Sequence, residues 1–126
     1  MSKFWISSKA DENLYTIMSE LDIDRPTALK LALAKGLVEV GTVREPKKIK
    51  DHKREIPLDA VVKDDFLLIK HLIINQIQRP LEDAEIVPYV AHYINEGLAI
   101  MAEEINHLSE MDNYLLYLVT KHGKGD

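Results

Sequence analysis

An alanine- and leucine-rich segment near residues 25–40 constrains the fold of this chain more than any other feature. From Ala28 it reads ALKLALAKGLVEV, with few polar interruptions. Its apolar stripe has helical spacing and consists of Leu29, Leu33, Leu37 and Val40, with Ala28 and Ala32 beside it. A helix of this kind is buried on most of its circumference, either in a core or at a subunit interface.

Helical periodicity recurs on both sides of this segment and predicts four further helices. Asp24 and Pro26 mark the start of the alanine-rich helix. The expected helices begin near residues 8, 25, 64, 82 and 109, and the fourth ends near residue 107. Gly97, inside the fourth, indicates either a break or a close approach of two helices. Two capping pairs predict the starts of the first and last helices: Ser8 with Asp11, and Ser109 with Asp112.

The residues before the first helix alternate in polarity, as in a short strand. Phe4 and Ile6 alternate with Lys3, Trp5 and Ser7. We therefore expect an all-α fold, a compact bundle of about five helices, with a short N-terminal β-strand as an optional addition. The 126 residues fit a single domain, residues 1–126. The expected helices carry more apolar surface than a small bundle hides, so we also expect a homo-oligomer.

The composition limits the chemistry open to the chain. It contains no cysteine, which excludes a disulfide framework, a thiol nucleophile and a thiolate metal site. No apolar run approaches the roughly 20 residues that span a bilayer. The first residues turn acidic too early for a secretory signal. We therefore expect a cytoplasmic protein that does not interact with membranes.

A basic stretch inside an acidic chain is the strongest sign of a binding surface. The whole chain has a net charge of −5, but Arg44–Arg54 holds six basic residues against two acidic ones, a net charge of +4. Residues 1–54 carry 11 basic and 8 acidic residues, whereas residues 55–126 carry 5 and 13. The stretch lies in a long loop, at about residues 42–63, and such loops are often functional. This charge attracts a polyanion, although a solvated lysine-rich loop is the plain alternative.

The end of this loop reads IPLDAVV. Its apolar residues are expected either to dock on the core or to form one short helix.

The sequence contains no recognisable catalytic or metal-binding constellation. Glu104 and His107 form one Glu-x-x-His pair, whereas a di-iron bundle needs two such pairs and further carboxylates. The alternative is a surface pair between Glu103 and His107. No serine lies in a Gly-x-Ser-x-Gly turn, and no glycine-rich phosphate loop is present. We therefore expect a non-enzymatic protein with no catalytic residue, no bound metal and no cofactor.

The aromatic residues fall into two groups. Tyr89, Tyr93, Tyr114 and Tyr117 have helical spacing, which favours packing in a core or an interface over base stacking. Trp5 lies on the more polar side of the expected strand. A partly exposed tryptophan there is either an anchor in a protein interface or a nucleic-acid contact, and the interface is the favoured interpretation.

Two families share features with the chain. Its first 40 residues, a strand followed by helices with MSELDIDR and PTALKLALAKGL, resemble the ribbon-helix-helix unit of DNA-binding dimers and antitoxins. In that unit the strand side chains enter the major groove. Nearly the whole chain resembles the DNA sulfur modification protein DndE family, through ISSKADENLYTIMSELDIDRPTALKLALAKGL, IPLDAVV and AHYINEGLAIMAEEI.

The second resemblance implies a helical fold, assembly as a tetramer and a lysine-rich surface that binds double-stranded DNA, with a preference for nicks. It also implies partner proteins of a sulfur modification system, which replace a non-bridging phosphate oxygen by sulfur. The chain would be a non-catalytic DNA-binding subunit of that system. The basic loop is then the expected DNA surface, and its phosphate contacts are assigned to Lys47, Lys48, Lys50, Lys53 and Arg54.

Two alternatives stay open from the sequence. A ribbon-helix-helix transcriptional regulator or antitoxin would read DNA bases through Lys3, Trp5 and Ser7. A pure assembly or adaptor protein would dock a partner on its acidic half and would not bind DNA. A nicking enzyme is a weaker third alternative, since no constellation of residues supports it.

Overall fold

The computed structural model describes residues 2–123 of the chain. Within these residues it has two strands and five helices, in the order β1 (Lys3–Ile6), α1 (Ser8–Leu21), α2 (Arg25–Glu39), β2 (Arg54–Pro57), α3 (Asp59–Val62), α4 (Phe66–Ile77) and α5 (Asp83–Gly123). The expected helical fold with a short N-terminal strand is confirmed for this part of the chain. Strand β2 was not expected.

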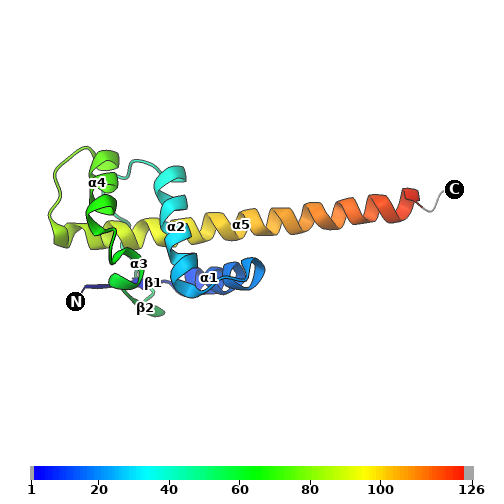
Figure 1. Cartoon of the computed structure of the whole chain (residues 1–126), viewed down its shortest axis with the longest axis horizontal. Helices are drawn as coiled ribbons and strands as arrows, with labels where there is room; N and C mark the ends of the chain where they lie inside the picture. The colour runs from blue at the N-terminus through cyan, green and yellow to red at the C-terminus, as the bar shows by residue number, and fades with distance from the viewer. Residues whose placement is uncertain (1, 124–126) are drawn as a thin grey trace.

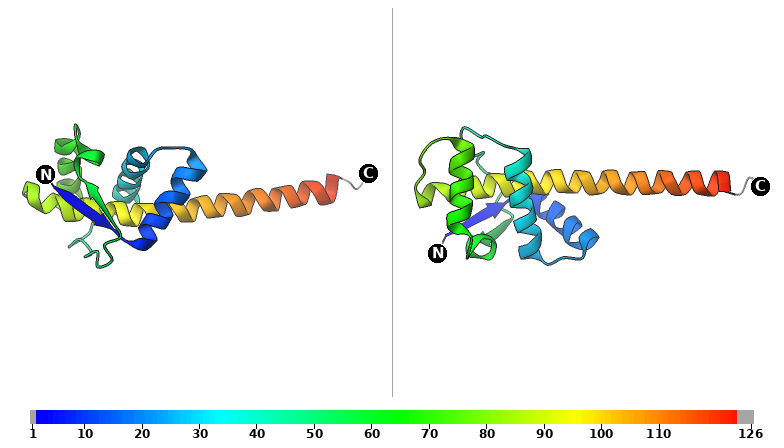
Figure 2. Two further views of the ribbon diagram at one scale, coloured as in Figure 1. Left: turned by 90° about the horizontal axis from the view of Figure 1, so that it is seen from below. Right: turned by 45° about the horizontal axis from the view of Figure 1, so that its top comes forward.

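Helix α5 is the axis of the molecule. The other elements gather along its first half, and its second half extends beyond them towards the C-terminus (Figures 1 and 2). The expectation of two helices separated near residue 108 is wrong, because α5 runs unbroken through Ser109 and Asp112. Between Leu98 and Thr120 the sequence has neither glycine nor proline. Its alanine, methionine, glutamate and leucine residues favour a continuous helix.

The two strands pair antiparallel and close one side of the core. Phe4 is paired with Ile56, and Ile6 with Arg54. Phe4, Ile6 and Ile56 are buried, whereas Lys3 is exposed, so the alternation predicted for the first strand is confirmed. The IPLDAVV segment both docks and forms a short helix, since it supplies the end of β2 and then α3 with two buried valines.

Side-chain caps set where the first two helices begin. Ser7, and not Ser8, caps α1, because its Oγ accepts a hydrogen bond from the Ala10 N–H over 3.1 Å. Asp24 caps α2 as predicted and accepts a hydrogen bond from the Thr27 N–H over 2.9 Å. A serine cap therefore fixes where the chain leaves β1 and enters α1.

Helices α2 and α5 cross at very close range, at two glycines. A Cβ atom added to Gly97 would overlap the backbone carbonyl of Ala32, and one added to Gly36 would overlap the backbone carbonyl of Tyr93. Gly97 therefore marks a close approach of helices and not a break. The stripe predicted on α2 is buried at this crossing and includes Ala28, Leu29, Ala32, Leu33 and Leu37.

Replacing Gly97 by alanine should lower the free energy of unfolding by about 2–3 kcal/mol, because the added methyl group meets backbone and not a flexible side chain. Urea unfolding followed by circular dichroism measures the change. The matched control is Ala99→Ser, at an exposed position of α5, which should cost about 0.5 kcal/mol at most. Equal stability of the Gly97→Ala variant and the parent would contradict the close crossing.

Candidate nucleic-acid interface

Residues 41–53, between α2 and β2, form an extended segment that we call the strap. Its first part is fastened to α5. The hydroxyl of Tyr93 donates a hydrogen bond to the Gly41 carbonyl (2.8 Å), and that of Tyr89 donates to the Arg44 carbonyl (3.2 Å). Both tyrosines are almost fully buried, which confirms the core packing predicted for them. Burial raises the pKa of Tyr93, so its hydroxyl keeps the proton that it donates.

A buried histidine holds the middle of the strap. The Lys47 N–H donates a hydrogen bond to Nδ1 of His92 over 3.0 Å, and His92 is only 7% exposed. Burial lowers the pKa of His92, the charge of Glu96 raises it in part, and the charge of Lys47 lowers it. A protonated Nδ1 could not accept this hydrogen bond. This anchor therefore requires a neutral His92.

The last part of the strap is fastened to α1 and β1. The Asp51 carboxylate accepts hydrogen bonds from the N–H and the Oγ–H of Ser8, over 2.9 and 3.1 Å. These bonds lower the pKa of Asp51, and the carboxylate lies at the N-terminal end of α1, where negative charge is favourable. The Lys53 N–H donates to the Ile6 carbonyl over 3.0 Å. The long loop predicted from the sequence therefore has a fixed path.

Arg54, predicted to contact phosphate, points its guanidinium at α1. Its Nε lies 2.6 Å from Oδ1 of Asp11, which is 5% exposed, and its Nη2 lies 3.0 Å from the Tyr15 hydroxyl. The hydrogen bond to Asp11 raises the pKa of Arg54. Removing one partner of a buried ion pair leaves an uncompensated charge and costs roughly 3–5 kcal/mol. The geometry therefore gives Arg54 a structural role in joining the strap to α1.

The other four predicted residues lie together and point into solvent. Lys47, Lys48, Lys50 and Lys53 are exposed, and none has a carboxylate oxygen within 4.0 Å of its Nζ in the part of the chain that the structure describes. Four lysines outside the strap do have such partners: Lys3, Lys9, Lys35 and Lys70. The strap therefore carries four lysines that form no direct ion pair with a carboxylate in the described part of the chain.

Grooves lie on both sides of the strap, and Lys47, Lys48 and Lys50 line both of them. One groove, of about 890 Å³, also contains Trp5 and Arg79. The other, of about 590 Å³, reaches α1 and α5.

Within the larger groove, the half-buried ring of Trp5 stacks on His52, with ring centroids 5.0 Å apart and planes inclined by 12°. The site thus combines cationic side chains with a flat aromatic surface. Sequence reasoning missed Arg79, which no local pattern connects to the strap, and His52, which lies inside the basic stretch itself.

The outer side chains of β1, which a ribbon-helix-helix protein would use, are occupied within the chain. Lys3 lies 3.1 Å from Glu55. The Ser7 side chain caps α1, and the Ser7 N–H donates to Oδ1 of Asn95 over 3.1 Å. Trp5 lies against His52 of the strap, and so belongs to the groove beside the strap lysines. These contacts favour the strap over β1 as the binding surface.

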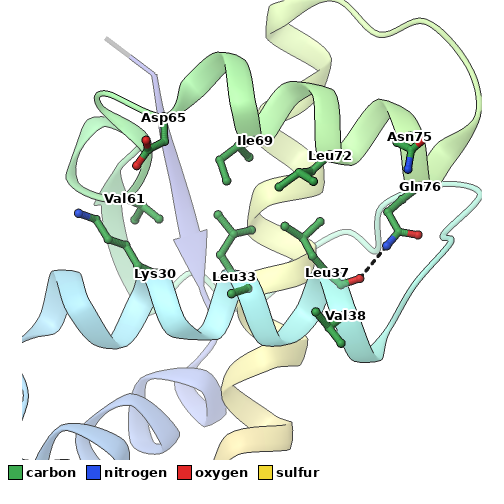
Figure 3. A pocket seen from close by; sticks show the side chains of 11 residues that line it. Lys30, Leu33, Leu37, Val38, Val61, Asp65, Ile69, Leu72, Asn75 and Gln76 are labelled. Carbon is green, nitrogen blue, oxygen red and sulfur yellow. Dashed lines mark hydrogen bonds between the residues drawn. The ribbon is translucent and has the colours of Figure 1, made fainter.

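A separate apolar hollow of about 340 Å³ lies between α2 and α4 (Figure 3). Its walls are mainly Leu33, Leu37 and Leu72, and the Gln76 side chain closes one end by donating to the Leu37 carbonyl over 2.8 Å. This hollow offers packing surface and no cluster of reactive groups.

The side chains that the structure describes include no group of three or more His, Asp or Glu residues that could hold a metal ion. His107 lies 3.9 Å from Glu110, and not beside Glu103 as the sequence suggested. No helix in the described chain is both long enough and apolar enough to cross a membrane.

Comparison with known proteins returned no protein-family model, no curated protein and no solved structure that matches the chain. The function is therefore inferred from the geometry of the site.

Stability should fall as the pH is lowered from about 7.5 to 5.5, and His92 should account for the fall. Its pKa is lowered in the folded state, so below its unfolded value of about 6.5 the unfolded chain binds the proton more readily. The lowered pKa values of Asp24, Asp51 and Glu85 act only in more acidic solution. Urea unfolding at several pH values measures the effect.

The variants that test this assignment are His92→Gln and His71→Gln, the latter at an exposed position of α4. The first should lose the pH dependence between 7.5 and 5.5, and the second should keep it. An unchanged pH dependence in His92→Gln would show that another group is responsible.

Proposed function

We propose that the chain binds double-stranded DNA through the phosphate backbone, using the strap as its contact surface. The observation that carries this proposal is the set of four exposed, unpaired lysines on a backbone held by hydrogen bonds at Gly41, Arg44, Lys47, Asp51 and Lys53. A fixed backbone lowers the conformational entropy lost on binding. Lysine ammonium groups on flexible stems suit phosphates, which they contact as point charges.

Lys47, Lys48, Lys50 and Lys53 are assigned to phosphate contacts, and Arg54 to holding the strap. Contacts to phosphates position a protein on the duplex without reading its sequence. Trp5 and His52 add a stacking surface beside the lysines, which suits an exposed base at an interruption of the duplex. A preference for nicked DNA would follow from this surface and from the easier bending of a broken duplex.

The resemblance to the DndE family extends the proposal to a biological setting. In that setting the chain is a non-catalytic subunit of a cytoplasmic DNA phosphorothioation system, and it acts with the other proteins of the system. Assembly as a tetramer would multiply the +4 charge of residues 44–54 and so increase attraction to the duplex.

Removing two strap lysines should weaken DNA binding and reduce its salt dependence. In the Lys48→Ala/Lys50→Ala variant, affinity for a labelled duplex should fall at least about tenfold in 0.1 M salt. The slope of log K against log salt should drop by about 1.8 if both lysines contact phosphates. Fluorescence anisotropy across a salt series measures both quantities on intact and nicked duplexes. Arg54 is kept in this variant, because its loss would leave Asp11 buried without a partner.

The charge-matched control is Lys30→Ala/Lys63→Ala, at two exposed positions outside the strap, which should retain most of the affinity. Equal losses in both variants would overturn the site assignment. Absence of binding by the parent at low salt would favour an assembly protein. Sequence-dependent binding that Lys3→Ala abolishes would favour a ribbon-helix-helix regulator.

A further inference from the structure

The second half of α5, residues 101–119, is a helix that lies largely outside the folded core (Figures 1 and 2). We call it the arm. From Glu103 to Val119 no side chain is buried. The apolar side chains of Leu108, Met111, Leu115, Leu116 and Val119 are between 51% and 68% exposed. A single helix that exposes this much apolar surface to water is an unfavourable arrangement, and such patches commonly mark interaction sites.

Apolar residues form a seam along one side of the arm: Met101 and Ile105 are partly buried against the core, whereas Leu108, Leu115 and Val119 are exposed. Met101, Ile105, Leu108, Leu115 and Val119 follow intervals of three and four residues, interrupted once at Asp112. The opposite side is polar and carries Glu103, Asn106, Glu110 and Asn113. This spacing is that of a helix packed side by side against another helix, as in a two-stranded coiled coil.

The seam continues onto the folded part of the molecule. At its base, Met101 lines a hollow of about 420 Å³ together with an exposed ridge of α2 formed by Leu31, Ala34 and Val38. Leu31 is 43% exposed and Val38 is 78% exposed, so this side of the alanine-rich helix is not covered within the chain. The apolar surface available to a partner therefore extends from the tip of the arm to α2.

We propose that the arm pairs antiparallel with the arm of a second copy of this chain. The arm cannot fold back on its own α2, because no glycine or proline between Leu98 and Thr120 provides a hinge. Residues 101–119 span about 27 Å at 1.5 Å per residue. In an antiparallel pair the tip of each arm reaches the hollow at the base of the other, so both exposed surfaces are covered by one two-fold interface.

The charge distribution favours the antiparallel direction over the parallel one. The start of the arm holds Glu103 and Glu104, whereas the sequence after Thr120 continues with Lys121. A parallel pair would set the acidic parts beside each other. An antiparallel pair sets each acidic part beside the basic end of its partner, which lowers the electrostatic energy of the pair.

Asp112 defines the register of this pair. When Met101 of one copy lies opposite Val119 of the other, Asp112 lies opposite Leu108 and not opposite its own copy. A single polar residue in an apolar seam commonly fixes register at a cost in stability. Asp112→Leu should therefore tighten the dimer.

Sedimentation of the full chain over a range of concentrations tests the interface. Leu108→Glu/Leu115→Glu should halve the mass of the assembled parent, because it places charge in the seam. The matched control is Asn106→Glu/Asn113→Glu, which adds the same charge on the polar side and should leave the mass unchanged. Circular dichroism should show that both variants keep the fold, since all four positions are exposed. A monomeric parent, or equal masses of the parent and the seam variant, would overturn the proposal.

Cysteine cross-linking tests the direction, because the natural chain contains no cysteine. Ile105→Cys/Leu115→Cys should form a covalent dimer under mild oxidation, and Leu115→Cys alone should not. Efficient cross-linking of the single variant would indicate a parallel pair and overturn the antiparallel arrangement. An assembled parent that neither variant cross-links would place the interface elsewhere. These outcomes do not depend on DNA, so they are separable from the proposed function.

Discussion

The close crossing of α2 and α5 is the constraint on which the rest of the structure depends. Gly36 and Gly97 lack the Cβ atoms that would otherwise separate the two helices. At this crossing Tyr93 is buried and directs its hydroxyl to Gly41, two residues after the end of α2. The packing of these two helices therefore sets where the first part of the strap runs, and α1 and β1 hold its last part.

The backbone and the side chains of the strap have different roles. Its backbone groups and Asp51 bind α5, α1 and β1, and Arg54 continues this anchoring through Asp11. The lysine side chains are left for an external anion. This division resembles the way other anion sites are built, where a scaffold fixes the geometry and charge supplies the attraction. The path of the strap also depends on the protonation state of His92, because a charged imidazole could not accept the hydrogen bond from the Lys47 N–H.

The sequence was informative wherever a pattern is local. The leucine stripe of α2, the alternation of β1 and the cap at Asp24 each depend on residues within a few positions, and the structure confirms them. Strand β2 was not predicted because it has only four residues and ends in proline. So short a segment shows no clear alternation of apolar and polar residues. The break expected near Ser109 was wrong because helix-forming residues flank it on both sides.

The site was predictable in part for the same reason. The four strap lysines were found from local charge, and their exposure agrees with a binding role that stays a prediction. The ion pair of Arg54 with Asp11 could not be predicted from the sequence, because the two residues are 43 positions apart. Asp11 was instead assigned to a helix cap with Ser8. Spacing along the chain carries no information about a contact that depends on how β2 brings Arg54 against α1.

Helix α5 also explains how an acidic chain can present a basic surface. Its first half lies under the strap, whereas its second half carries Glu103, Glu104, Glu110 and Asp112 away from it (Figure 1). Exposed charges farther apart than a Debye length, about 8 Å at physiological salt, are largely screened from each other. A phosphate at the strap therefore responds mainly to the lysines around it. The net charge of −5 averages over the strap and the second half of α5, and it is a poor guide to what either region attracts.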